Sequence, residues 1–147
     1  MRATTIALVI LLHLVSMTDA ADEVKGDLKL LQGVWEVTEH KPPSIPPTVY
    51  TKIAIKSNIM TMHTSLKGNT ASIDCTVLLN TDSNPKQIDF SATTGFNKDK
   101  AFKGIYELKE DKLKICYRGP QSTRPKSFDD INDGNDSTIF LTLKRNK

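Results

Sequence analysis

The sequence predicts an all-β fold, an eight-stranded up-and-down antiparallel barrel preceded by a short helical turn. Eight short runs of alternating apolar and polar residues follow one another along residues 34–145, and a period of two is typical of strands with one buried face. Turn-rich segments separate nearly all of them at hairpin spacing. Such strands close naturally into a barrel, which leaves no sheet edge exposed. A two-sheet sandwich is the alternative, because strand count alone does not separate the two architectures.

The first twenty residues have the pattern of a secretory signal peptide. Arg2 supplies a positive charge, residues 6–15 form a mostly apolar run, and small residues precede a cleavage site after Ala20. A membrane-spanning helix needs about 20 apolar residues, so this run is too short and we expect no membrane span. The sequence thus predicts a secreted protein with a signal peptide over residues 1–20 and a single β-barrel domain over residues 21–147.

The charge pattern argues against nucleic-acid binding. The chain has 20 Lys and Arg residues against 17 Asp and Glu residues, a net charge of +3, and removal of residues 1–20 takes away one residue of each sign. The basic residues are dispersed, whereas nucleic-acid binding favours a basic block with interleaved aromatic residues. We therefore expect no nucleic-acid partner. A domain of this length also buries enough surface to fold without many disulfides.

The helical turn is predicted over residues 27–32. Asp27 suits the N-cap position, and Leu28 and Leu31 are three residues apart, so they share one side of a helix. Gly33 is expected to end the helix, since a glycine just past the last turn readily adopts left-handed backbone angles.

Turn chemistry separates the predicted strands. Residues 41–47 contain four prolines and cannot join a sheet ladder, whereas residues 67–69 (Lys-Gly-Asn) and 110–111 (Glu-Asp) suit tight hairpins. Alternation within the second strand places Val49, Thr51, Ile53 and Ile55 on one face. The eight predicted strands cover residues 34–40, 48–56, 58–66, 70–79, 86–93, 101–109, 112–118 and 137–145.

The two cysteines, Cys75 and Cys116, leave two alternatives open. A secreted protein favours a disulfide, yet Cys75 shares a strand face with Ile73 and Val77, whereas Cys116 lies opposite Ile115 on its strand. Alternate residues of a strand point to opposite faces, so the two thiols are expected on opposite sides of the barrel wall. They can form a bridge there only near strand ends or bulges.

Gly33, Trp35 and Arg145 carry a resemblance to a known family. A short helical turn, Gly-x-Trp at the start of the first strand and an arginine at the end of the last strand resemble the signature of the lipocalin (calycin) superfamily. The resemblance implies that Arg145 lies across the indole of Trp35 and closes one end of the barrel. Such a cation–π pair is worth about 0.5–2 kcal/mol.

Four ordered motifs resemble one branch of that superfamily, a lipocalin-like domain of unknown function common in planctomycete bacteria, over about residues 28–145. The resemblance implies a fold and no reaction, since fold alone does not supply function. Its pattern does not require Cys75 and so does not support a disulfide. The matching residues are Leu31, Gly33 and Trp35; Gly104, Ile105, Tyr106 and Leu108; Leu113, Cys116 and Tyr117; and Arg124, Pro125 and Phe128.

Candidate catalytic and metal-binding residues are few. Two histidines follow the signal peptide, His40 and His63, on separate predicted strands and with no further ligand nearby in sequence, whereas a metal or nucleophile site needs several such groups together. The acidic segment 129–136 fails as a calcium loop, because Ile131 stands at a ligand position. We expect no enzyme activity, no catalytic residue, no cofactor and no metal. Asn135 begins an Asn-Asp-Ser sequon and is the predicted glycosylation site.

Two functions remain open. The first is a binding protein that holds a small apolar ligand with an anionic head in the barrel or at its mouth. The second is a non-enzymatic structural or interaction protein of the extracellular matrix or a secretion, with a barrel filled by its own side chains; cavity volume separates the two. Arg124 also has a structural interpretation, hydrogen bonding to nearby carbonyls. The candidate contacts to an anionic head are Lys52, Lys100, Lys103, Arg118 and Arg124.

Overall fold

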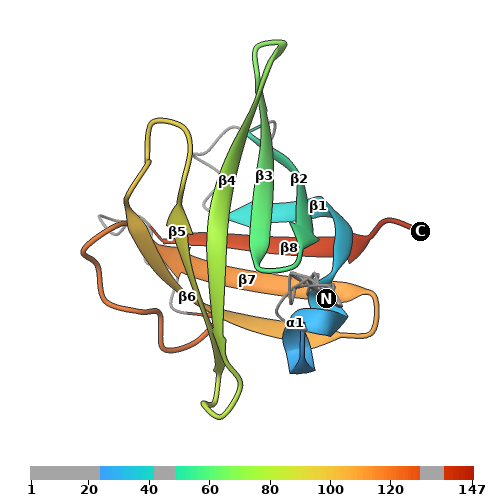
Figure 1. Ribbon diagram of the computed structural model, residues 1–147, viewed down its shortest axis with the longest axis vertical. Coiled ribbons are helices and arrows are strands. Elements are labelled where there is room, and N and C mark those ends of the chain that lie inside the picture. The colour runs from blue at the N-terminus through green and yellow to red at the C-terminus, as the bar shows by residue number, and fades with distance from the viewer. Residues whose placement is uncertain (1–23, 42–48, 130–137) are drawn as a thin grey trace, which may run out of the picture.

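The computed structural model describes residues 24–41, 49–129 and 138–147. The predicted signal peptide over residues 1–20 and the Asn135 sequon lie outside the described residues. Within them the chain forms one short helix and eight strands (Figure 1).

The strands form a closed antiparallel barrel. Each strand pairs with its neighbours in sequence, and β8 pairs with β1, so the ring closes. The predicted barrel is confirmed, and the sandwich alternative is wrong. The helix is α1, Gly26–Leu31; the strands are β1 Gly33–Lys41, β2 Tyr50–Lys56, β3 Ile59–Leu66, β4 Asn69–Asn80, β5 Lys86–Ala92, β6 Ala101–Lys109, β7 Lys112–Arg118 and β8 Ile139–Arg145.

Tight turns join the strands where the sequence predicts them. Lys67 and Gly68, with φ angles of 50° and 82°, form the β3–β4 turn, and Glu110 has a φ of 50° in the β6–β7 turn. Left-handed backbone angles at these positions match the right-handed twist of the flanking strands. Both predicted hairpins are confirmed.

The inner faces of the strands form one continuous apolar core, and Ile53, Ile88 and Leu141 are among its fully buried members. A smaller cluster lies on the outward side of β6, β7 and β8, where Ile105, Cys116 and Phe140 are buried with Phe128 packed against them.

The positions of the cysteines follow from these two clusters. Cys75 belongs to the inner core and Cys116 to the outer cluster, so the expected placement on opposite sides of the wall is confirmed. The two do not form a disulfide, and of the two alternatives the bridged one is wrong in this structure. The alternation of the strands keeps the sulfurs apart.

Trp35 and Arg145 close one end of the barrel, next to α1. The guanidinium of Arg145 lies 4.1 Å from the centre of the indole ring, and its two terminal nitrogens donate hydrogen bonds of 2.7 Å to the carbonyls of Leu30 and Gln32. The indole Nε1 donates to the carbonyl of Leu31 at 2.9 Å. The arrangement implied by the resemblance is confirmed, and it also satisfies carbonyl groups at the end of α1 that have no partner within the helix.

Gly33 allows that close approach. It has a φ of 115°, and a Cβ there would lie 3.3 Å from Nη1 of Arg145. Its role in ending the helix is confirmed, because the helix stops at Leu31 and the strand begins at Gly33 itself.

Asp27 is not the N-cap, contrary to the sequence-based prediction. The N-cap is Lys25, without a side-chain capping bond. Asp27 lies in the first turn of α1, where its carboxylate accepts hydrogen bonds of 2.7 Å from the hydroxyl of Tyr106 and the ammonium of Lys86. The carboxylate therefore binds α1 to the wall of the barrel and does not cap its own helix.

Replacing Asp27 with asparagine is expected to lower the free energy of unfolding at pH 7 by about 1 kcal/mol and to flatten its dependence on acid. The hydrogen bond from Lys86 lowers the pKa of Asp27; burial opposes this shift, and Tyr106 adds to it. Because this pKa is lower in the folded than in the unfolded chain, the ionised carboxylate stabilises the fold above the unfolded pKa, and that contribution is lost as the pH falls through the folded pKa.

Urea unfolding in steps from pH 7 to pH 3 measures the effect. Asp82, an exposed carboxylate in the β4–β5 loop, supplies the control Asp82→Asn, and an Asp27 variant with the acid slope of that control would contradict the assignment.

A β-bulge changes the predicted alternation at the start of β2. Its register with β3 shifts by one residue between Tyr50 and Lys52, because a bulge sets two residues of one strand against one of the other. Tyr50 packs against the inner core, while Thr51 is exposed. The prediction that Thr51 shares the inward face of Ile53 is therefore wrong, and Tyr50 takes that place.

Candidate functional site

A cavity of about 220 Å³ lies inside the barrel at the end away from Trp35. At that end β2, β6 and β8 start, and β5 and β7 finish. The β5–β6 loop and the segment after β7 lie on the left of the barrel in Figure 1, and α1 lies on the right. The cavity is lined by Tyr50, Met62, Ile73, Cys75, Phe90, Ala92, Asn97, Phe102, Tyr117, Gly119, Pro120 and Ile139.

Aromatic rings form one wall of the cavity. The rings of Phe90 and Phe102 are stacked, with centroids 5.2 Å apart and planes 14° from parallel. Tyr117 packs edge-on against both, at centroid distances of 4.9 Å and 6.0 Å. Stacked and edge-to-face pairs are the geometries that aromatic rings prefer, so this wall is a stable surface and presents flat ring faces and edges.

The hydroxyls of two tyrosines meet in the cavity. Tyr117 donates a hydrogen bond of 3.1 Å to the hydroxyl oxygen of Tyr50. Burial, followed by the neighbouring Tyr50, raises the pKa of Tyr117 well above its ordinary value. Tyr117 is therefore protonated at neutral pH, and its proton is used in the bond to Tyr50.

Cys75 adds a thiol to the wall. Burial, assisted by the charge of Asp74, raises its pKa to about 11. The thiol is therefore neutral near pH 7, where it behaves as a small apolar group with little nucleophilic character.

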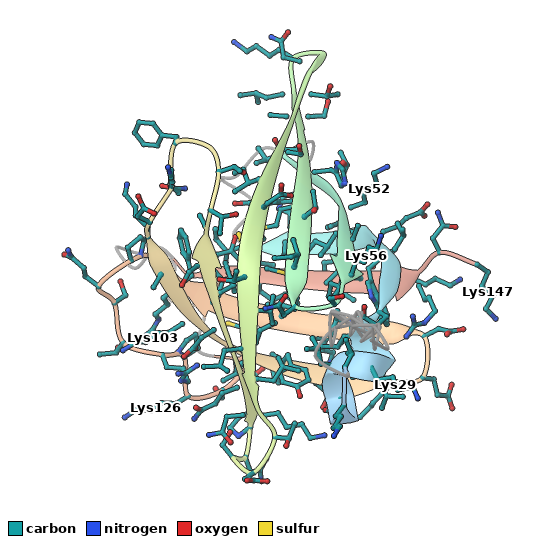
Figure 2. The ribbon with its side chains drawn as sticks, in the orientation of Figure 1. Lys29, Lys52, Lys56, Lys103, Lys126 and Lys147 are labelled. Atoms are coloured by element: carbon teal, nitrogen blue, oxygen red, sulfur yellow. The ribbon has the colours of Figure 1, made fainter. Side chains whose placement is uncertain are left out.

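The predicted cationic contacts do not line this cavity. Lys52 and Lys103 are exposed and project outward from the barrel wall (Figure 2). Lys100 contacts a residue of the rim: its ammonium lies 5.1 Å from the ring centre of Phe96 and donates a 3.3 Å hydrogen bond to the side chain of Asn97, which lines the cavity.

The two predicted arginines are held by other parts of the wall. Arg118 is 7% exposed, and its guanidinium donates to the hydroxyls of Thr138 and Thr123 at 3.0 and 3.1 Å. Arg124 pairs with both carboxylate oxygens of Asp89 and donates a 2.7 Å hydrogen bond to the carbonyl of Gly104. The structural interpretation of Arg124, hydrogen bonding to a neighbouring carbonyl, is confirmed.

The two histidines lie apart. A register shift between Val37 and Glu39 places His40 of β1 opposite Leu141, and its Nδ1 is buried with no hydrogen-bond partner in the described part of the chain. His63 of β3 lies opposite Lys52. Over residues 24–41, 49–129 and 138–147, no three His, Cys, Asp or Glu side chains come together as metal ligands would.

A larger hollow of about 620 Å³ lies on the outer surface beside β1, β7 and β8. Its lining includes Glu39, Lys109, Lys112 and Lys144, all of them exposed. Solvated charges of this kind bind an apolar molecule poorly, since ligand sites are concave and mostly apolar. The inner cavity is therefore the better candidate site.

Sequence reasoning missed the aromatic character of the site. The residues concerned are Tyr50, Phe90, Phe102 and Tyr117, which come from four different strands. A signal was available for two of them: Phe90 and Phe102 are directly paired across β5 and β6, in strands whose alternation the sequence displays. Tyr50 carried no such signal, because the bulge reverses its face.

Comparison with known proteins adds no relative. The chain matches no protein-family model, no curated protein and no solved structure. The lipocalin-like resemblance therefore stays a prediction. Among the described residues, the one helix is too short and too polar to cross a bilayer.

Proposed function

We propose that this chain is a secreted, lipocalin-like binding protein that holds a small apolar molecule in the open end of its barrel. The observation that carries the proposal is the cavity of about 220 Å³, lined mainly by apolar and aromatic side chains, in a barrel whose other end is closed by Trp35 and Arg145. Small-molecule sites are typically concave and apolar, with a few polar groups that orient the ligand.

Burial of the ligand supplies the driving force. Apolar surface removed from water contributes about 25 cal/mol per Å², and the rings of Phe90, Phe102 and Tyr117 already hold one another in place. A preformed wall loses little conformational freedom when a ligand enters, which favours affinity.

The groups in the cavity favour binding over catalysis. Cys75 and Tyr117 both have raised pKa values, so neither is ionised at neutral pH. A general base or nucleophile works best with a pKa near the working pH or below it. We therefore propose a non-enzymatic role that needs no cofactor.

The support for secretion comes from residues 1–20, with Arg2, the apolar run over residues 6–15 and the small residues before Ala21. Edman sequencing of the protein recovered from the medium of expressing cells tests this. We expect the mature chain to begin at Ala21, and an intact N-terminus on cell-retained protein would contradict it.

Filling the cavity is expected to weaken ligand binding strongly. Ala92 lines the cavity and is 2% exposed, so Ala92→Leu places three further carbons in that space. Ser91 is exposed on the opposite face of β5, so Ser91→Leu is a matched control. We expect saturable binding of fluorobenzene by ¹⁹F NMR, at least about ten-fold weaker in Ala92→Leu and unchanged in Ser91→Leu.

The interaction-protein alternative makes the opposite prediction. A barrel that works only through its surface, in the matrix or in a secretion, needs no ligand, so fluorobenzene would show no saturable binding up to millimolar concentration. Equal binding by the Ala92→Leu variant and the wild-type protein would also contradict a site in the barrel.

A further inference from the structure

We infer that the cavity takes an uncharged, planar aromatic molecule of about nine non-hydrogen atoms that carries an oxygen acceptor. The inference rests on the proposed ligand-binding function and narrows it to a chemical class. Four features of the cavity lead to it: its volume, the charge of its lining, the shape of one wall and the hydrogen-bond donors at its mouth.

The volume sets the size of the ligand. A protein cavity of about 150 Å³ holds one benzene molecule. In proportion, a cavity of about 220 Å³ holds about nine non-hydrogen atoms. A long-chain fatty acid has about twice that number, so most of its chain would remain in water and contribute little to binding.

The lining sets the charge of the ligand. No Lys, Arg, His, Asp or Glu is among the described residues that line the cavity, and Cys75 and Tyr117 are neutral there because their pKa values are raised. An anion inside would lose its hydration without gaining a countercharge, which is strongly unfavourable. Lys100 reaches Asn97 at the rim, so a charged head would have to stay outside the cavity.

The aromatic wall sets the shape. Phe90 and Phe102 are stacked almost parallel, and Tyr117 stands across them. Met62 lines the cavity from β3, a strand far around the ring from β6 and β7, and a methionine sulfur makes favourable contacts with aromatic rings. A flat ring can extend the stacking on one side and meet the thioether on the other.

The tyrosine pair sets the polar group. Tyr117 donates its hydrogen bond to the oxygen of Tyr50, so the hydroxyl proton of Tyr50 has no acceptor among the described residues. Asn97 accepts from Lys100 through its side-chain oxygen, so its amide NH₂ group also remains available as a donor. Two donors at the mouth favour a ligand with a carbonyl or ether oxygen.

Four ligands of equal size separate these features. Acetophenone is flat and neutral and has a carbonyl acceptor; benzoate keeps the ring and adds a charge; cyclohexyl methyl ketone keeps the carbonyl and loses the flat ring; α-methylstyrene keeps the ring and loses the acceptor. Titration calorimetry of the mature protein at pH 7 would compare them. We expect acetophenone to bind most tightly, benzoate to bind at least about ten-fold more weakly, and the other two to bind about three- to ten-fold more weakly.

The variant Tyr50→Phe tests the hydrogen bond directly. We expect it to weaken acetophenone binding about five-fold and to leave α-methylstyrene within about two-fold. Thr51→Val removes a neighbouring hydroxyl that is exposed on the outer side of β2 and should change neither affinity. Equal losses for both ligands in Tyr50→Phe would indicate a disturbed cavity and would overturn the assigned role of the hydroxyl.

The outcomes separate the ligand class from the function. Tightest binding of benzoate, or equal binding of the saturated ketone and acetophenone, would overturn the class. If fluorobenzene binds and Ala92→Leu blocks it while acetophenone shows no advantage, the class fails and the binding function stands. If fluorobenzene and all four ligands fail to bind, both fail together.

Discussion

Replacing Trp35 with alanine is expected to lower the free energy of unfolding by about 3–5 kcal/mol, because it removes a large, fully buried side chain. Trp35 is 0% exposed in the inner core, and its indole lies under the guanidinium of Arg145 and donates to the carbonyl of Leu31. The substitution therefore leaves a cavity, an unpaired carbonyl and an arginine without its ring. For a domain of this size the loss corresponds to a fall in melting temperature of about 10–20 °C.

The variant Arg145→Met separates the contribution of the arginine from that of the buried indole. Arg145→Met keeps most of the apolar stem but removes the cation–π contact and the hydrogen bonds to Leu30 and Gln32, and we expect a loss of about 2 kcal/mol. The double variant should lose less than the sum of the two single losses, because both remove the same ring–guanidinium contact.

Thermal and urea unfolding, followed by circular dichroism, measure these losses. The control is Val34→Ala, one residue away on β1, where the side chain is 37% exposed and the expected loss is below about 1 kcal/mol. A Trp35→Ala variant that unfolds within about 2 °C of the wild-type protein would show that the closed end contributes little to stability.

The barrel itself could be predicted from the sequence because the alternation of apolar and polar residues along each strand shows which face is buried. Alternation in runs such as residues 112–118 fixes which side chains point inward, and it placed Cys75 and Cys116 correctly on opposite sides of the wall. Two hairpin turns could be predicted from short segments as well, and Gly68 and Glu110 in these turns have positive φ angles. These are local properties, read over a few neighbouring residues.

The candidate site depends on relations that are not local. The bulge near Tyr50 turns that residue inward. The alternation of residues 48–56 is regular and does not indicate a bulge. The five predicted cations lie near strand ends, where a positive side chain could face the mouth of the barrel. The charge of a residue does not determine the direction in which its side chain points. Arg124 is held by Asp89, 35 residues away, and Lys103 projects into solvent.

Asp27 shows the same limit for the helix. As an acidic residue at the start of a helical turn, it fits the N-cap by composition. Its actual partners, Tyr106 and Lys86, lie 79 and 59 residues further along the chain. Sequence position alone could not favour that bond over a local one.

Replacing Gly104 with alanine is expected to lower the free energy of unfolding by about 2–3 kcal/mol, because β6 has no space for a Cβ at this position. A Cβ built there would lie 2.8 Å from the carbonyl oxygen of Cys116 and 3.0 Å from the Cβ of Tyr117. The first of these neighbours is backbone within a paired strand, so it can move only if the β6–β7 pairing also moves. The carbonyl of Gly104 in turn accepts the hydrogen bond from Arg124, which the same displacement would weaken.

This substitution also links stability to the cavity. Tyr117 lines the cavity and is paired across from Gly104, so pushing it away changes the aromatic wall as well as the core. Gly104→Ala should therefore weaken fluorobenzene binding as well as lower the melting temperature by about 6–12 °C. Lys103→Ala, one residue earlier and exposed on the outward face, should change stability by less than about 0.5 kcal/mol and leave binding intact. If Gly104→Ala were as stable as that control, the strands would have to accommodate a methyl group where the structure places a carbonyl oxygen, and the packing described for β6 and β7 would be wrong.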